Sequence, residues 1–103
     1  MDKAKFPGFY KLSIGERLKK VHESGWLSEQ DLLSLRDGHH TLPLSRADKM
    51  IENVVGVMGL PLGLGLNFNV NQKNYIVPLV VEEPSIVAAL SSAAKIFSES
   101  GGI

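Results

Sequence analysis

The sequence predicts an α+β fold with short N-terminal helices, a longer amphipathic helix, a β-hairpin and a buried, alanine-rich C-terminal helix. Three observations lead to this prediction. Helix start signals recur in the first half, apolar stretches flank a polar turn at residues 71–74, and apolar residues follow Pro84 with helical spacing. A chain of 103 residues is long enough for one small core.

Each start signal places a hydroxyl at the N-cap and a carboxylate three residues later. The pairs are Ser13 with Glu16, Ser28 with Asp31, and Ser45 with Asp48. We expect the first helix over residues 14–24, stopped by Gly25, and the second over residues 29–36, stopped by Gly38. Both are short, so they need a larger neighbour to pack on.

The third helix has the strongest apolar stripe of these three, with the spacing of one buried helix face. The stripe consists of Ala47, Met50, Ile51, Val54, Val55 and Met58. The helix is predicted to end at Gly59-Leu60-Pro61, because proline cannot continue a helix. The glycine-rich residues 62–66 are predicted to be irregular.

Two strands are predicted on either side of the turn. Residues 66–70 alternate apolar side chains with Asn67 and Asn69, which indicates a strand with one wet face. Residues 75–81 are continuously apolar, as in a strand covered on both faces. Pro78 removes one ladder donor, which favours an edge or a bulge there.

The last helix is predicted to begin at Pro84, which suits the first helical position and makes Glu83 the N-cap. Its apolar stripe is Ile86, Leu90, Ala93 and Phe97, and Gly101-Gly102 stops it. Alanines 88, 89, 93 and 94 make the helix slim enough for a close neighbour.

Composition narrows the function classes. Lys+Arg 11 balance Asp+Glu 11, so we expect neither nucleic acid nor an anionic membrane as a partner. With Cys 0, disulfides and thiolate metal sites are excluded. The polar N-terminus lacks a signal-peptide core, and no run approaches the ~20 apolar residues of a spanning helix. We expect a soluble, cytoplasmic protein.

The Glu82-Glu83 pair is the most unusual chemical feature. It stands between an apolar strand and an apolar helix, so at least one carboxylate is expected to be partly buried. Burial and a like-charged neighbour raise a carboxyl pKa, and a helix N-terminus lowers it. A group between these influences is suited to proton transfer near neutral pH. From residues alone, a solvated acidic N-cap pair remains the simpler interpretation.

Three other features could suggest ligand binding, but each also has a simple structural explanation. Residues 59–65 superficially resemble a phosphate-binding glycine loop, but they lack the Walker lysine and the G-x-G-x-x-G order, so backbone packing is favoured. The adjacent His39 and His40 have no third ligand nearby, so we expect no metal site. The basic residues around the first helix could meet a phosphate or simply form its wet face. They are Lys3, Lys5, Lys11, Arg17, Lys19 and Lys20.

Two stretches carry a family resemblance. M-I-E-N-V-V-G at residues 50–56 looks like the E-N-V-I-G segment of 3-hydroxy-3-methylglutaryl-coenzyme A (HMG-CoA) reductases. P-L-V-V-E-E-P-S-I-V-A-A at residues 78–89 closely resembles V-E-E-P-S-x-V-A-A of the bacterial class II enzymes. F-P-G-F-Y-K-L-S at residues 6–13 resembles the family's opening. The resemblance covers nearly all of the chain and is that of an N-terminal portion.

The resemblance implies an NAD(P)H-dependent oxidoreductase that reduces HMG-CoA to mevalonate and coenzyme A. The family's catalytic glutamate falls on Glu83, as a proton donor to the mevaldehyde carbonyl oxygen. Ser85 matches a position that contacts the hydroxymethylglutaryl group. Lys11 lies near the position of a basic site for the coenzyme A phosphate, where family members place arginine one residue earlier. Glu52 and Asn53 match a dimer-interface segment.

The resemblance also implies a domain plan. Residues 1–44 would be an N-terminal helical segment, and residues 45–103 the first part of the large substrate-binding and dimerisation domain. The family's lysine, aspartate, histidine and nicotinamide-binding domain would lie beyond Ile103, so we expect the chain to be inactive alone and to bind no cofactor or metal itself. We expect a dimer or a pairing with the rest of its polypeptide. The alternative is a non-catalytic dimerisation module.

Overall fold

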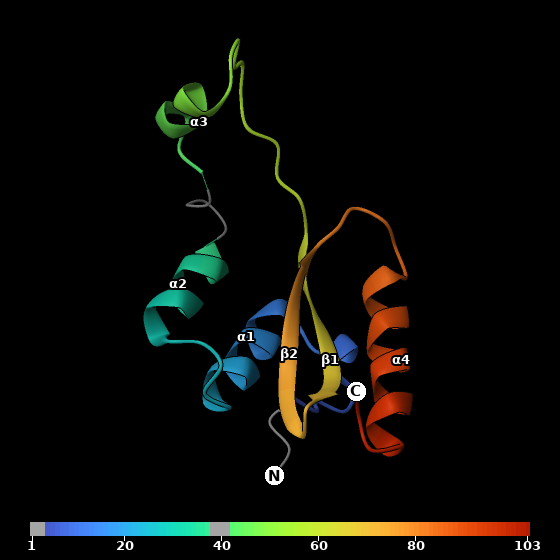
Figure 1. Ribbon diagram of the computed structural model, residues 1–103. Helices are drawn as coiled ribbons and strands as arrows, with labels where there is room; N and C mark the ends of the chain where they lie inside the picture. The colour runs from blue at the N-terminus through green and yellow to red at the C-terminus, as the bar shows by residue number, and fades with distance from the viewer. Residues whose placement is uncertain (1–3, 38–41) are drawn as a thin grey trace. The chain divides into compact units, whose positions relative to one another are not determined.

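A computed structural model describes residues 4–37 and 42–103 (Figure 1). These residues form a short 3-10 helix, four α-helices and one two-stranded antiparallel sheet, so the α+β class is confirmed. They divide into two compact units, residues 8–58 and residues 59–103 with the N-terminal residues up to Pro7. The boundary at residue 44 that the resemblance implies differs from the division between these two units and stays a prediction.

Two short helices in the first unit follow the predicted capping. α1 (Ile14–Glu23) begins where the Ser13 Oγ accepts the Glu16 N–H at 3.2 Å, and the same hydroxyl donates to the Glu16 carboxylate at 2.9 Å. α2 (Glu29–Asp37) begins where the Ser28 Oγ accepts the Asp31 N–H at 3.1 Å. Val21 of α1 is buried. The predicted stop at Gly38 lies outside the described residues.

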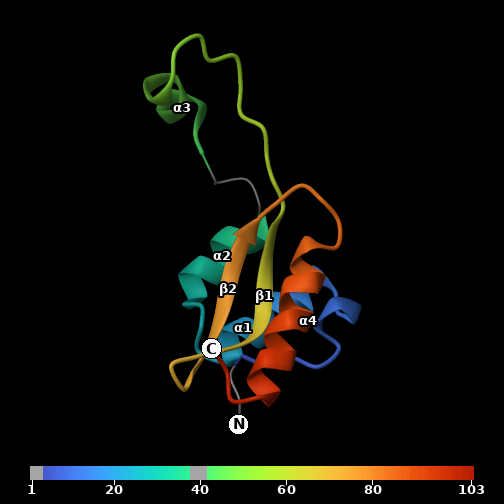
Figure 2. The same cartoon turned by 45° about the vertical axis from the view of Figure 1, so that its right-hand side comes forward.

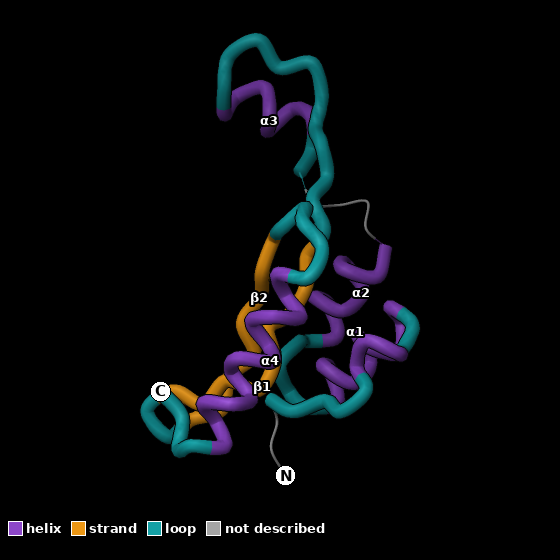
Figure 3. The backbone as a smooth tube through the Cα atoms, turned by 90° about the vertical axis from the view of Figure 1, so that its right-hand side faces the viewer, coloured by secondary structure: helices purple, strands orange, loops and turns teal. Residues whose placement is uncertain are grey.

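The third helix is shorter than predicted. α3 (Leu44–Met50) starts after Pro43, so Ser45 is inside the helix and is not its N-cap. The backbone becomes extended at Ile51, and Asn53 takes a left-handed conformation with φ 57°. Figure 3 draws the segment between α3 and β1 as loop. β-branched residues around Gly56 have low helix propensity, and a stripe without a partner face does not compensate for it.

The hairpin pairs β1 (Leu62–Val70) with β2 (Lys73–Val80). Asn71 and Gln72 make a two-residue turn, and their φ values of 51° and 66° match the twist that such turns require. The glycine-rich residues 62–66 were predicted to be irregular, and this prediction is wrong because they belong to β1. Pro78 lies in an edge strand, as predicted, because a two-stranded sheet has no central strand.

A β-bulge interrupts the ladder where Leu66 and Asn67 together oppose Ile76. Asn67 has φ 68°, and its N–H donates to the Ala4 carbonyl at 2.9 Å. Its side-chain amide donates to the Ser91 carbonyl at 3.4 Å. Asn67 and Asn69 are both half-buried, so the predicted wet face of this strand is wrong.

α4 (Ile86–Glu99) lies along β1 (Figures 1 and 2). The face that packs there is shifted by about one residue from the predicted stripe. A Cβ at Gly63 of β1 would meet Val87, which is outside that stripe, and one at Gly65 would meet Leu90, which belongs to it. The side chains of this helix that are buried or half-buried are Val87, Leu90, Ser91, Ala94 and Ser98. The predicted stripe residues Ile86 and Phe97 are 43% and 55% exposed.

Burial in this chain is limited. Ala94 is the buried residue of α4, so the helix that was predicted to be buried is covered on one face. Tyr75 and Val80 of β2 are exposed, so this strand is not covered on both faces as predicted. Among the described residues, the buried apolar side chains are Ala4, Val21, Ala47, Leu66 and Ala94. The elements thus offer more apolar surface than they cover.

Candidate functional site

Glu83 and Ser85 lie in the connection of residues 81–85 between β2 and α4, and both are exposed. The connection is tied at each end. The Val81 N–H donates to the Pro61 carbonyl at 3.2 Å, and the Ser85 carbonyl accepts the Ala89 N–H at 2.9 Å. Ser85 has φ 74°, a left-handed conformation that is unusual for a residue other than glycine and concentrates at functional sites.

This geometry corrects two expectations for the acidic pair. α4 begins at Ile86 after Ser85, so Glu83 is not the N-cap and Pro84 is not the first helical residue. The left-handed Ser85 cannot belong to a right-handed helix, which explains the later start. Glu82 and Glu83 are both exposed, so the predicted partial burial is wrong. An exposed Glu83 carboxylate is instead accessible to a ligand.

Lys11 closes the 3-10 helix η1 (Phe9–Lys11), and its exposed ammonium lies 5.7 Å from the centre of the Tyr10 ring. Arg17 of α1 donates hydrogen bonds to the carbonyls of Phe9 and Tyr10 at 3.1 and 3.0 Å. Arg17 therefore does more than form the wet face of the first helix, because it fixes the turn that carries Lys11.

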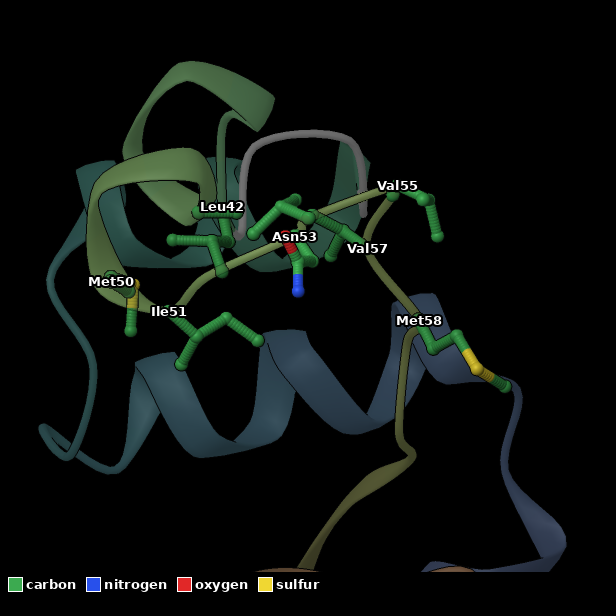
Figure 4. A pocket seen from close by; sticks show the side chains of 10 residues that line it. Leu42, Met50, Ile51, Asn53, Val55, Val57 and Met58 are labelled. Atoms are coloured by element: carbon green, nitrogen blue, oxygen red, sulfur yellow. The ribbon is translucent and has the colours of Figure 1, made fainter.

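Glu52 and Asn53 follow α3 and are exposed. Asn53 helps line a hollow of about 370 Å³ in this unit, and Figure 4 shows the lining side chains from close by. The lining residues are Leu42, Ala47, Met50, Ile51, Asn53, Val54, Val55, Gly56, Val57 and Met58. Most of them are apolar, and Val55 and Met58 are 103% and 94% exposed. The hollow is thus part of an exposed apolar segment.

The predicted site residues fall in both units. Glu83 and Ser85 share the hairpin unit, whereas Lys11, Glu52 and Asn53 belong to the unit of residues 8–58. Within the hairpin unit, sequence reasoning missed Ser91 and Asn67, which join α4 to the bulge of β1. A serine in an apolar helix stripe was the available signal, but its partner lies 25 residues away.

The glycine-rich segment, the histidine pair and the apolar runs were the remaining features of the sequence analysis. A Cβ at Gly63 would lie 3.2 Å from Val87 Cγ2, and one at Gly65 would lie 3.2 Å from Leu90 Cδ2, so packing explains these two glycines. His39 and His40 lie outside the described residues. Over residues 4–37 and 42–103, no three His, Asp or Glu side chains gather as a metal site. No helix in that part of the chain has the length and apolar character to cross a bilayer.

Comparison with known proteins gives consistent matches. The family model described as hydroxymethylglutaryl-coenzyme A reductase matches residues 13–103. The 3-hydroxy-3-methylglutaryl-coenzyme A reductase of Archaeoglobus fulgidus is 50% identical over 99 residues, which are 96% of this chain and 22% of that protein. A probable reductase of Borreliella burgdorferi is 49% identical over 47 residues, or 46% of this chain and 11% of that protein.

A solved structure agrees with these sequence matches. The class II reductase from Streptococcus pneumoniae, bound to NADPH in open conformations, superposes with a TM-score of 0.88 and 41% identity. The match covers 95% of this chain and 26% of that one, over an N-terminal fragment. A second structure of the Streptococcus pneumoniae enzyme gives the same TM-score and identity, with 23% of its chain covered.

The relatives are oxidoreductases that share this α+β fragment. The chain belongs to the HMG-CoA reductase family, as the motifs at residues 50–56 and 78–89 had indicated. It spans about a quarter of the length of the relatives that match nearly all of it.

Proposed function

We propose that this chain supplies part of the substrate-binding domain of an HMG-CoA reductase, an enzyme that reduces HMG-CoA to mevalonate and coenzyme A in isoprenoid metabolism. The observation that supports this most is the motif at residues 78–89, within a family match over residues 13–103. Because the chain covers only 22% of the Archaeoglobus fulgidus enzyme, we propose that it is inactive alone.

Glu83 is the proposed catalytic acid. Reduction of the mevaldehyde carbonyl to an alcohol requires a proton on the carbonyl oxygen, and a positioned carboxylic acid can donate it. The exposed position of Glu83 in the connection before α4 is compatible with direct contact to a substrate. Ser85 lies two residues later in the same connection and is proposed to bind the hydroxymethylglutaryl group.

The nicotinamide cofactor is proposed to bind elsewhere in the complete enzyme. When bound, NAD(P)H supplies the reducing equivalents, two cofactors for each thioester. The glycine-rich residues of this chain do not fit a phosphate, because Gly63 and Gly65 pair with Leu79 and Val77 and pack against α4. Lys11 is proposed for the phosphate of coenzyme A instead, and Glu52 and Asn53 for contact with a second subunit.

The test uses a full-length class II reductase in which this chain replaces the corresponding segment. Purified enzyme is assayed for HMG-CoA-dependent oxidation of NADPH. Glu83→Gln keeps the side-chain shape but cannot donate the proton, so kcat is expected to fall about 10²–10⁴-fold. Glu82→Gln, the adjacent exposed glutamate, is the matched control and retains most of the activity. Turnover of Glu83→Gln within about threefold of the parent would remove Glu83 from the mechanism.

A non-catalytic dimerisation module is the second candidate, and the exposed apolar segment around Val55 and Met58 favours it. The reading frame after Ile103 separates the two functions. An open frame that encodes the family's catalytic lysine, aspartate and histidine supports the reductase. A stop codon directly after Ile103 supports the module.

A further inference from the structure

The bulge of β1 is completed by a side chain from α4. Because Leu66 and Asn67 together oppose Ile76, the ladder with β2 has no regular partner for their N–H groups. The Leu66 N–H, on a residue only 8% exposed, donates to the Ser91 Oγ at 3.0 Å. The Ser91 carbonyl accepts the Asn67 amide at 3.4 Å. Ser91 thus meets both bulge residues.

These hydrogen bonds fix where α4 lies along β1. Apolar packing alone allows a helix to slide over a sheet, because it has little directional preference. The Ser91 hydroxyl adds a directional contact near the middle of α4. A Cβ at Gly63 would lie 3.2 Å from Val87 Cγ2 and one at Gly65 would lie 3.2 Å from Leu90 Cδ2, so the two glycines permit the close approach of helix and strand. Both the axial position and the separation are therefore determined.

The connection that carries Glu83 and Ser85 depends on this placement. Only residues 81–85 join β2 to α4, and the Val81 N–H anchors the β2 end to Pro61. The other end is the first turn of α4, where the Ser85 carbonyl accepts a hydrogen bond from the Ala89 N–H. A helix moves as a rigid body, so a shift at Ser91 is transmitted to Ser85 six residues earlier.

We propose that Ser91 is a positioning residue for the substrate-binding connection, which it holds in place through its hydrogen bond to the bulge of β1. The proposal rests on the proposed function for its reaction. It adds a residue outside the motif at residues 78–89 and assigns the β1 bulge a role in the site. A misplacement of ~1 Å at a reacting group can cost about 10²-fold in rate.

The main experiment compares Ser91→Ala with Ser92→Ala in the same full-length reductase. Ser92 is the matched control, since it is the adjacent serine of α4 and is exposed. Ser91→Ala is expected to lower kcat about tenfold or more and to raise KM for HMG-CoA severalfold, because Glu83 and Ser85 shift together. KM for NADPH stays unchanged, as does the activity of Ser92→Ala. Ser91→Thr keeps the hydroxyl and is expected to retain most of kcat.

A second variant changes the position of α4 on β1 and leaves Ser91 intact. In Gly63→Ala the new Cβ lies 3.2 Å from Val87 Cγ2, so α4 is pushed outward by a few tenths of an ångström. A rise in KM for HMG-CoA smaller than that of Ser91→Ala is expected. Gly15→Ala in α1 is the control, because its Cβ would meet nothing within 4 Å.

Three results overturn the proposal. Ser91→Ala enzyme that keeps both kinetic constants shows that the hydroxyl positions nothing. A fall in kcat without a change in KM for HMG-CoA indicates loss of folded enzyme only. An equal loss in Ser92→Ala or Ser91→Thr indicates a general effect on α4. If Glu83→Gln is also fully active, the proposed function fails as well; if Glu83→Gln is inactive, only the role of Ser91 fails.

Discussion

Lys11 is presented by a turn that a side chain from another element holds in place. A 3-10 helix of three residues has few hydrogen bonds of its own, and its geometry is poorer than that of an α-helix. The two bonds from the Arg17 guanidinium to Phe9 and Tyr10 stabilise it from α1. The Lys11 ammonium is exposed over the Tyr10 ring, a contact worth about 0.5–1 kcal/mol at an exposed site. The cation therefore remains accessible to an anionic ligand.

This accessibility gives a prediction for Lys11→Ala in the full-length reductase. If Lys11 pairs with the coenzyme A phosphate, the variant raises KM for HMG-CoA more than it lowers kcat. The difference from the parent shrinks as salt is added, because salt screens exposed ion pairs. Steady-state kinetics at low and high ionic strength measure both effects. Lys19→Ala, which removes an exposed lysine 3.9 Å from Glu23, is the control. An unchanged KM for HMG-CoA at low salt would show that Lys11 belongs only to the solvated surface around the first helix.

At the level of single residues, a local motif selected the candidate residues of the connection, and their roles stay predictions. Glu83 and Ser85 were selected by the motif at residues 78–89, although the burial argument for the acidic pair was wrong. Ser91 and Asn67 could not be selected, because their contact depends on a bulge and on a partner about 25 residues away in sequence. Long-range hydrogen bonds leave no periodic signal in the sequence.

At the level of elements, the predicted starts of α1 and α2 were confirmed, whereas the predicted N-caps Ser45 and Glu83 were wrong. Ser13 and Ser28 begin α1 and α2 because each hydroxyl accepts an N–H three residues later. Predictions based on apolar stripes were less successful. The stripe through residues 47–58 predicted a helix up to Gly59, but the helix ends at Met50. The stripe predicted for α4 differs by one residue from the face that is buried. A stripe identifies apolar positions, but the partner face decides whether they become helical or buried.

The two serines predicted as N-caps allow a matched test of capping. Ser13→Ala removes the acceptor for the Glu16 N–H, so the free energy of unfolding is expected to fall by about 1 kcal/mol. Ser45→Ala replaces an exposed serine inside α3 that caps nothing, and little change is expected. Urea denaturation followed by far-UV circular dichroism measures both variants. Equal losses in the two variants would show that the Ser13 hydroxyl adds nothing specific.

At the scale of the whole molecule, the apolar surface exceeds what the described elements cover. Met50 and Ile51 are each 67% exposed, and Val55 and Met58 are almost fully exposed. The hairpin unit also exposes Val80, Ile96 and Phe97. The chain spans 26% of the Streptococcus pneumoniae enzyme that it matches, so that relative has further chain available to cover such faces. Exposed apolar patches above roughly 300–600 Å² usually mark contact surfaces.

We therefore predict that the isolated chain self-associates through the segment of residues 50–58, as a dimer or larger. Val55→Asp places a charge on the most exposed of these side chains, and burying an unpaired charge in an interface is unfavourable, so the variant is expected to sediment as a monomer at micromolar concentration. Ile14→Asp, at an exposed apolar residue of α1 outside this segment, is the control and leaves association unchanged. Analytical ultracentrifugation of the three proteins decides the question. A parent chain that sediments as a monomer, with sharp near-UV signals from Trp26 and the tyrosines, would contradict the prediction, because its apolar side chains would then be covered within one folded copy.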